Sequence, residues 1–304
     1  MATVEALLTV ALARLRAAGS ESARLDAEVL LGHTLGTDRT TIAAHPEAPV
    51  SDSSAERFET AIARRERGEP VAYIRGLKEF RGLAFGVDPR ALIPRPETEL
   101  LVGLAEAEIV HALTSGPRPT GAPPLRVLDV GTGSGAVAIA LAVDLRKRRM
   151  LDDVEINATD VSSDAIDLAR ENAVAHAVGD RVTFQVADLL PGDAVAAWDV
   201  IVANLPYVRA DAIVGLPRSI SFEPVQALDG GPDGLTLIGR FVDLLPEALA
   251  PLGAVLVEIG GDQEAGMLGL VAERLPTWSC EIRRDLGGLP RVARIARAAH
   301  RAPA

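Results

Sequence analysis

Apolar residues in the first third of the chain recur every three or four positions, which is the spacing of one face of an α-helix. The first such set lies between positions 4 and 15 and comprises Val4, Leu7, Leu8, Ala11, Leu12 and Leu15. Residues 22–35 repeat the pattern and end before Gly36, and residues 51–67 begin with the good N-cap residues Ser and Asp and end before Gly68. These segments predict a small N-terminal helical domain.

From residue 125 onward, short apolar runs alternate with amphipathic stretches. The runs predict seven strands, at residues 125–130, 154–159, 181–186, 199–203, 254–259, 279–284 and 291–296. The stretches predict helices at residues 135–148, 163–176, 234–249 and 263–275. Strand–helix alternation of this kind is typical of an α/β fold with a doubly wound, mostly parallel sheet. The last two strands are close enough in sequence to form an antiparallel hairpin at the sheet edge.

A different kind of segment joins these two parts. Residues 80–87 predict a short hairpin with a glycine-assisted turn, and residues 92–99 form a loop stiffened by two prolines. Pro96 is suited to open a helix with Glu97 and Glu99 in its first turn. Residues 115–124 are rich in Pro and Gly. We therefore expect a helical domain at 1–75, a hairpin and connecting loop at 76–100, and a larger domain at 101–304.

Composition narrows the class of protein. The 304 residues are 48% hydrophobic and 24% charged, with a net charge of −11 and one cysteine, Cys280. These values fit a globular protein without an internal disulfide or a cysteine-rich zinc site. The five histidines have no ligand-like spacing. With no signal peptide and no long apolar run, the sequence predicts a cytoplasmic protein that binds no metal and no membrane.

The strand at 125–130 runs into a glycine-rich turn and then a helix. Glycines allow the backbone to pass close beneath a ligand that faces the helix N-terminus. Asp160 ends the next strand, where a carboxylate can accept both hydroxyls of a ribose. This pattern fits either a nicotinamide dinucleotide or S-adenosylmethionine. Asp129, just before the first glycine, favours the cationic methionine group, and Asp188 offers an acceptor for an adenine amino group.

The tetrapeptide Asn204-Leu205-Pro206-Tyr207 follows the fourth strand and favours a methyltransferase that acts on nitrogen. An amide nitrogen is a poor nucleophile because its lone pair is delocalised. The Asn204 side-chain oxygen and the Leu205 carbonyl can each accept one N–H of an NH2 group, which aims that nitrogen at a methyl donor. Tyr207 can stack on a planar substrate group. The predicted catalytic and substrate-binding set is Asn204, Leu205, Pro206 and Tyr207.

Segments along nearly the whole chain resemble bacterial release-factor glutamine N5-methyltransferases, a family of class I S-adenosylmethionine-dependent enzymes. The matching segments are residues 22–31, 68–76, 79–80, 92–99, 129–135, 204–207, 221–224, 228–235 and 258–263. The run Pro94-Arg95-Pro96-Glu97-Thr98-Glu99 separates this family from the related ribosomal-protein methyltransferases. The resemblance implies a Rossmann-like, seven-stranded methyltransferase domain that follows the helical domain in the sequence.

The resemblance also implies a substrate and a set of site residues. The substrate would be the glutamine of the Gly-Gly-Gln loop of class I peptide release factors, and the cofactor would be S-adenosyl-L-methionine. The expected cofactor-binding residues are Asp129, Gly131, Thr132, Gly133, Ser134, Gly135, Asp160, Asp188, Leu189 and Asn204. The helical domain and the residues Arg95, Glu97 and Glu223 would help to bind the release factor.

Leu205 departs from the family pattern, which has Asn-Pro-Pro-Tyr at this place. A proline would fix φ near −65° and remove an N–H, whereas leucine keeps the carbonyl acceptor and adds a donor. We expect activity to survive, because the accepting oxygen belongs to the main chain. A shifted substrate preference stays open.

Three alternatives remain at the level of sequence. One is a glutamine methyltransferase with another protein substrate, and another is a protein that binds the cofactor without turnover. The third is DNA adenine N6-methylation, which needs a basic cleft that this acidic chain does not suggest, and we expect no direct binding of nucleic acid. Arginines gather at positions 283, 284, 291, 294, 297 and 301, where they form either a solvated face or a docking patch for an acidic partner.

Overall fold

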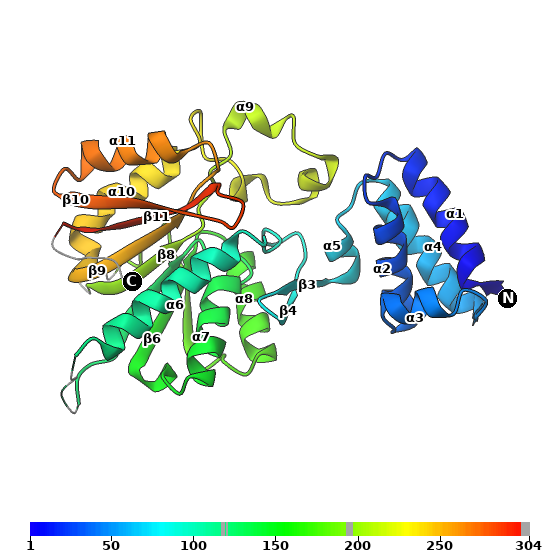
Figure 1. Cartoon of the computed structure of the whole chain (residues 1–304), viewed down its shortest axis with the longest axis horizontal. Helices are drawn as coiled ribbons and strands as arrows, with labels where there is room; N and C mark the ends of the chain where they lie inside the picture. The colour runs from blue at the N-terminus through cyan, green and yellow to red at the C-terminus, as the bar shows by residue number, and fades with distance from the viewer. Residues whose placement is uncertain (117–118, 120, 193–196, 299–304) are drawn as a thin grey trace. The chain divides into compact units, whose positions relative to one another are not determined.

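The computed structural model describes residues 1–116, 119, 121–192 and 197–298. Two compact units divide the chain (Figure 1). The first consists of Met1–Leu77 together with Pro217–Phe222, and the second of Lys78–Leu216 and Glu223–Ala304. The first unit therefore includes residues 217–222, which lie far outside the helical domain predicted at 1–75.

The first unit is helical and has its own core. Its elements are β1 (Ala2–Thr3), α1 (Val4–Ala17), α2 (Ala23–Leu35), α3 (Arg39–Ala44), β2 (Pro49–Val50), α4 (Asp52–Glu66), α5 (Val71–Arg75) and, from the later segment, the 3₁₀ turn η2 (Arg218–Phe222). The Thr3 and Ser51 side chains cap α1 and α4 by accepting backbone N–H groups. Leu15, Leu30 and Leu31 are fully buried in the core. The short helices α3 and α5 and the β1–β2 pair were not predicted.

A seven-stranded sheet forms the centre of the second unit. Its strands are β5 (Leu125–Val130), β6 (Val154–Asp160), β7 (Val182–Val186), β8 (Trp198–Ala203), β9 (Leu249–Glu258), β10 (Trp278–Arg284) and β11 (Pro290–Arg297). Their order in the sheet is β10-β11-β9-β8-β5-β6-β7. The pairs from β9 to β7 are parallel, and β10 and β11 are antiparallel, which confirms the predicted hairpin at the edge. β9 begins five residues before the prediction because Leu249 already pairs with Trp198.

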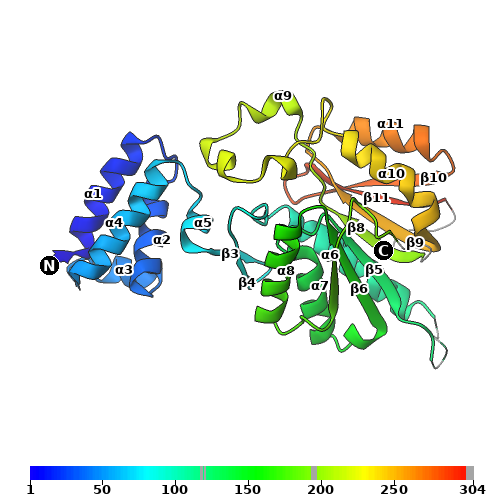
Figure 2. The same ribbon diagram turned by 180° about the vertical axis from the view of Figure 1, so that it is seen from behind.

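Helices cover both faces of this sheet. The main ones are α6 (Thr98–Thr114), α7 (Ala136–Lys147), α8 (Ser163–Ala175), α10 (Thr236–Ala248) and α11 (Glu264–Arg274), with shorter turns at α9 (Ala210–Ile213), η1 (Leu151–Asp153) and η3 (Val225–Ala227). Helices α6, α7 and α8 lie side by side (Figures 1 and 2). Apolar residues of α10 and α11 share a core with β8 and β9. In the described part of the chain, no helix has both the length and the apolar character that a bilayer span requires.

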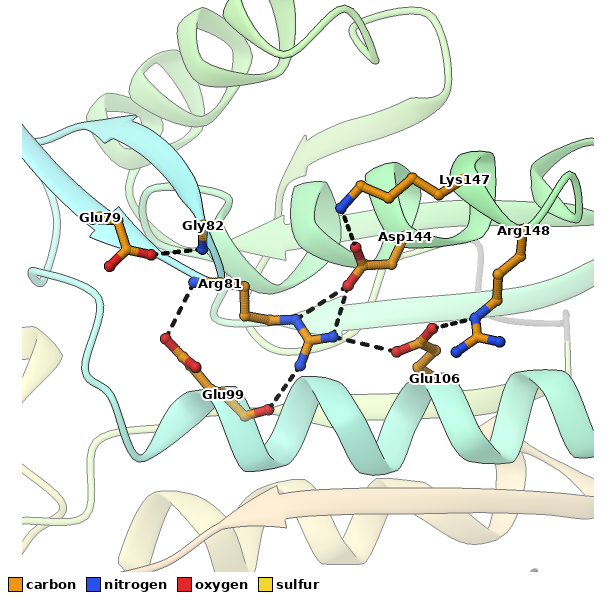
Figure 3. Close-up of polar contacts among 8 residues, drawn as sticks. All are labelled: Glu79, Arg81, Gly82, Glu99, Glu106, Asp144, Lys147 and Arg148. Carbon is orange, nitrogen blue, oxygen red and sulfur yellow. Dashed lines mark hydrogen bonds and ion pairs between the residues drawn. The ribbon is translucent and has the colours of Figure 1, made fainter.

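The hairpin of β3 (Leu77–Phe80) and β4 (Leu83–Gly86) is attached to α6 and α7 through one arginine at its turn. Arg81 and Gly82 both have positive φ angles, 49° and 71°. The Arg81 guanidinium donates to Asp144 of α7 at 2.7 Å and to Glu106 of α6 at 3.3 Å (Figure 3). It also donates to a backbone carbonyl at the start of α6. This cluster fixes the hairpin beside the two helices.

The arginine-rich C-terminal region is not a uniform solvated face. Arg294 is only 2% exposed and forms a buried ion pair with Glu108 of α6, so the prediction of a solvated face is wrong at that position. The other described arginines of the group pair with nearby acids or, in the case of Arg297, stack over Trp278. A charge count along the sequence does not reveal these partners. Arg301 lies outside the described residues.

Candidate active site

A cavity opens at the carboxyl edge of the parallel strands, where open α/β sheets bind their ligands. It is lined by residues 131–134 after β5, Asp160 at the end of β6, Asp188 and Leu189 after β7, and residues 204–206 after β8. The sheet order brings β8, β5, β6 and β7 next to one another, so these segments meet at one place. The structure therefore brings together most of the residues that the sequence predicted as a site.

The glycine-rich turn is held tightly against β6. The amides of Gly131 and Thr132 both donate to the Thr159 carbonyl, at 2.8 and 2.9 Å. Gly135 has a φ of 81°, and a Cβ at this position would lie 2.7 Å from the Ile139 side chain. Only glycine fits there. The turn thus brings its backbone to the cavity wall at the start of α7.

Burial raises the pKa of both acids beside this turn. Asp129 is 1% exposed, and its pKa is raised to about 7 by burial, against the opposing effect of hydrogen bonds from the Thr132 hydroxyl and the Ala138 amide. The pKa of Asp160 is also raised by burial, although its oxygens accept from the amides of Gly133 and Ser162, each at 2.9 Å. Two poorly solvated carboxyl groups therefore line the cavity, an arrangement that favours a cationic ligand.

The next part of the wall combines an exposed acid with a strained backbone. Asp188 is paired with Arg240 at 2.7 Å, and both side chains are more than half exposed. Leu189 has a φ of 68°, an unfavourable conformation for a residue with a side chain. The Thr159 hydroxyl donates to the Leu189 carbonyl at 2.7 Å and stabilises this bend. The bend keeps residues 188 and 189 on the cavity wall.

The NH2 group of the Asn204 side chain is hydrogen-bonded within the protein. Its Nδ2 donates to the Thr98 hydroxyl at 3.0 Å, and both residues line the cavity. A side-chain amide carries two donor hydrogens and one acceptor oxygen. With Nδ2 turned toward Thr98, the Asn204 oxygen is available as an acceptor.

Leu205 differs from its neighbours because its side chain is part of the core. It is 3% exposed and belongs to the apolar cluster shared by β8, β9 and α10. Its Cδ2 would lie 3.2 Å from a Cβ placed on Gly131. The packing of Leu205 beneath the glycine-rich turn anchors the tetrapeptide. Its effect on substrate preference remains a prediction.

Among the described residues that line the cavity, Asn204, Leu205 and Pro206 are present and Tyr207 is not. Its hydroxyl donates to Glu258 at 3.2 Å, and burial raises the pKa of that phenol. Gln263 donates to the Tyr207 carbonyl at 2.9 Å. Gly230 packs so closely on this segment that a Cβ there would lie 2.8 Å from the Tyr207 Cα. The ring is therefore held by the protein, and stacking on a substrate remains a prediction.

The proline-rich loop is fastened by an ion pair across a long sequence separation. Arg95 donates to Glu223 at 2.6 Å, and Glu223 also accepts from the Ile93 amide at 3.0 Å. Glu223 is 4% exposed. Glu97 occupies the N-cap position of α6. Of these three predicted substrate-binding residues, Arg95 alone lines the cavity, among the residues that the structure describes.

Sequence reasoning did not assign a role to three polar residues behind the tetrapeptide, namely Thr98, Glu258 and Gln263. Each lies within a segment that matches the family, which was an available signal. Each is also buried to at least nine-tenths, a fact that the sequence does not give. Within the described residues, no group of three His, Cys, Asp or Glu side chains is arranged to hold a metal ion.

Comparisons with known proteins agree with the two units. Residues 6–76 match a family model described as the PrmC N-terminal domain, and residues 123–242 match a methyltransferase domain. A release factor glutamine methyltransferase of Nitratidesulfovibrio vulgaris is 37% identical over 293 residues, which cover 95% of this chain and 94% of that protein. A second, from Moorella thermoacetica, is 40% identical over 264 residues, 86% of this chain and 87% of that protein.

A solved structure shares the fold at low identity. The catalytic domain of human Mettl16 in complex with an RNA hairpin has a TM-score of 0.56 and 16% identity, over 86% of this chain and 87% of that one. At that identity the likeness concerns the fold alone.

Proposed function

The chain belongs to the release factor glutamine methyltransferase family, and we propose that it methylates the glutamine of the Gly-Gly-Gln loop of class I peptide release factors. The methyl group would come from S-adenosyl-L-methionine and go to the side-chain amide nitrogen, N5. The observation that carries this proposal is the Asn204 amide, which lines the cavity with Nδ2 bonded to Thr98 and its oxygen available.

The cavity suits a cationic cofactor better than a pyrophosphate. Asp129, Asp160 and Asp188 line it, whereas its two arginines, Arg90 and Arg95, are each paired with acids of the protein. The glycine-rich turn allows close approach of a ligand to the backbone at the start of α7. We assign the methionine group to the neighbourhood of Asp129, the ribose to Asp160, and the adenine to Asp188 and Leu189. The backbone of residues 131–135 would lie against the cofactor.

The protein contributes positioning rather than strong acid–base chemistry. S-adenosylmethionine supplies an electrophilic methyl group on a positively charged sulfur. Asn204 Oδ1 and the Leu205 carbonyl would each accept one N–H of the substrate amide, which directs its lone pair toward the donor. Both acceptors also favour the positive charge that develops on the nitrogen. The methylated nitrogen is acidic and releases its proton without a dedicated base.

Transfer of labelled methyl groups to a purified release factor tests this function. We expect labelling of the wild-type factor and none of a factor whose Gly-Gly-Gln glutamine is replaced by alanine. Asn204→Ala should lower the rate roughly a hundredfold or more, because it removes an acceptor for the reacting amide. Asn157→Ala is the matched control, because Asn157 lies in β6 and bonds Glu155. Equal labelling of the two factors, or labelling of duplex DNA, would contradict the assignment.

A further inference from the structure

A buried asparagine lies behind the glycine-rich turn and connects it to the β3–β4 hairpin. Asn172 belongs to α8 and is 3% exposed. Its Nδ2 donates to the Ser134 carbonyl at 2.9 Å and to the Gly86 carbonyl at 3.0 Å. Its Oδ1 accepts from the Gly86 amide at 2.8 Å. Both donor hydrogens and the acceptor oxygen of this side-chain amide are therefore in use.

These hydrogen bonds join two segments that are far apart in the sequence. Gly86 is the last residue of β4, and Ser134 lies in the turn between β5 and α7. Strand β4 continues along α8, where the His176 ring makes a hydrogen bond with the Ala84 carbonyl at 3.0 Å. Asn172 is absent from the described residues that line the cavity, so it would act on a ligand through the turn.

The turn has a backbone that needs such support. Its three glycines have positive φ angles: Gly131 at 71°, Gly133 at 54° and Gly135 at 81°. Glycine has more backbone freedom to lose than any other residue, so a turn with three glycines is costly to hold in one conformation. The peptide group between Ser134 and Gly135 is fixed on both sides. Its carbonyl accepts from Asn172, and its N–H donates to the Thr132 carbonyl at 2.9 Å.

Helix α8 supports the cavity wall with apolar contacts as well. Ala169 lies one turn before Asn172, and a Cβ on Gly135 would lie 3.1 Å from the Ala169 Cβ. Ala165, one turn further toward the start of α8, packs in a small cluster with Ala91. Ala91 and Ala165 both line the cavity. One face of α8 therefore contacts both the glycine-rich turn and the loop around residue 91.

We propose that Asn172 is a positioning residue that joins strand β4 to the glycine-rich turn and holds the turn in the conformation that binds the cofactor. The inference rests on the proposed function for the identity of that cofactor, S-adenosylmethionine, and does not involve the release factor. A turn that is ordered before the ligand arrives loses no further backbone freedom on binding, and this raises the affinity.

Hydrogen exchange in the protein without cofactor tests the ordering directly. Asn172→Ala removes the partner of the Ser134 carbonyl and should make the amides of residues 131–135 exchange roughly tenfold faster, the effect of losing about one hydrogen bond. Val271→Ala is the control for a general loss of stability, because Val271 is buried in α11 of the same unit and does not line the cavity, among the described residues. Exchange in the turn should change less than about twofold in this control.

Cofactor affinity tests the consequence for binding. Titration calorimetry with S-adenosylmethionine should give a dissociation constant that is roughly tenfold higher for Asn172→Ala and unchanged for Val271→Ala.

A substitution in the hairpin tests whether Asn172 carries the connection. A Cβ on Gly86 would lie 3.0 Å from Asn172 Oδ1, so Gly86→Ala should displace the amide and weaken cofactor binding about threefold. In the Asn172→Ala background the added methyl group meets no amide, and Gly86→Ala should have no further effect. Such non-additivity is not expected if the two residues only contribute to stability.

The outcomes separate this inference from the proposed function. Wild-type exchange in the turn of Asn172→Ala, or an equal effect of Gly86→Ala in both backgrounds, overturns the positioning role. If Asn172→Ala does not fold, Gly86→Ala decides the matter: faster exchange in the turn supports the role, and unchanged exchange overturns it. Faster exchange in Asn172→Ala together with a wild-type protein that binds no S-adenosylmethionine would refute the proposed function and still support the ordering of the turn by Asn172.

Discussion

At the scale of single residues, Asp129 combines a candidate functional role with an energetic cost. It is buried beside the glycine-rich turn, and its pKa is raised to about 7 from an ordinary value of 3.8. A raised pKa means that the folded protein holds the proton more tightly than the unfolded chain does. Burial of Asp129 therefore destabilises the folded protein in a pH-dependent way. The loss of stability is absent below pH 3.8, grows as the pH rises, and is complete above about pH 7.

We predict that Asp129→Asn gains stability relative to the wild type as the pH rises from 4 to 8. The asparagine oxygen can still accept from Thr132 and Ala138, and it has no charge to bury. The relative gain should be on the order of 4 kcal/mol across that window, from about 1.4 kcal/mol per unit of pKa shift. Urea unfolding of both proteins at several pH values, without cofactor, measures it. A stability difference between the two proteins that does not change with pH would show that burial does not raise the pKa of Asp129.

Single-residue contacts were also the least predictable part of the site. The acids and glycines around the cavity could be predicted, because each directly follows a strand and strand ends meet at one edge. The link between Asn204 and Thr98 spans 106 residues, and that between Arg95 and Glu223 spans 128. Hydrophobic periodicity tells which face of an element is buried and does not tell which polar residues meet.

At the scale of elements, the length of a segment decided how well it could be predicted. The strand Leu125–Val130 has the predicted bounds, and the four predicted helices of the second unit differ by at most two residues at each end. The helices α3 and α5 have only six and five residues, too few for a periodic pattern to emerge. The same limit applies to the two-residue strands of the first unit.

Arg81 attaches the turn of the β3–β4 hairpin to α6 and α7, whereas Asn172 and His176 hydrogen-bond its strand β4, and the arginine contacts give a prediction. Arg81 is 22% exposed and joins Asp144 and Glu106, which belong to two different helices (Figure 3). Arg81→Asn keeps the turn, because asparagine tolerates positive φ and Asn-Gly is a favoured hairpin turn. It removes the guanidinium and should lower the free energy of unfolding by about 2 kcal/mol.

Chemical denaturation of Arg81→Asn and of Lys147→Ala separates this contribution from an ordinary surface pair. Lys147 contacts the same Asp144 and is 62% exposed, so its removal should change stability by less than about 0.5 kcal/mol. Equal effects of the two substitutions would show that other contacts hold the hairpin, such as the hydrogen bonds of β4 with Asn172 and His176.

At the scale of the whole molecule, the two units have separate apolar cores. The core of the first unit contains Leu30, Leu31 and Phe58, and none of its members lines the cavity beside β5. The candidate cofactor residues lie entirely in the second unit. Damage to the first core should therefore leave the cofactor site intact, and this allows the role of the helical unit to be tested in the full chain.

We predict that Leu30→Ala weakens use of the release factor without weakening cofactor binding. Leu30 is fully buried, and its truncation should cost the helical unit about 3 kcal/mol. Calorimetry should show a transition that moves to lower temperature and that S-adenosylmethionine does not shift, since a ligand stabilises only the unit that binds it. The KM for the factor should rise while the dissociation constant of S-adenosylmethionine stays unchanged. Val10→Ala, at a 57% exposed position of α1, should alter neither value. If Leu30→Ala weakens cofactor binding as much as it raises that KM, the stabilities of the two units are coupled.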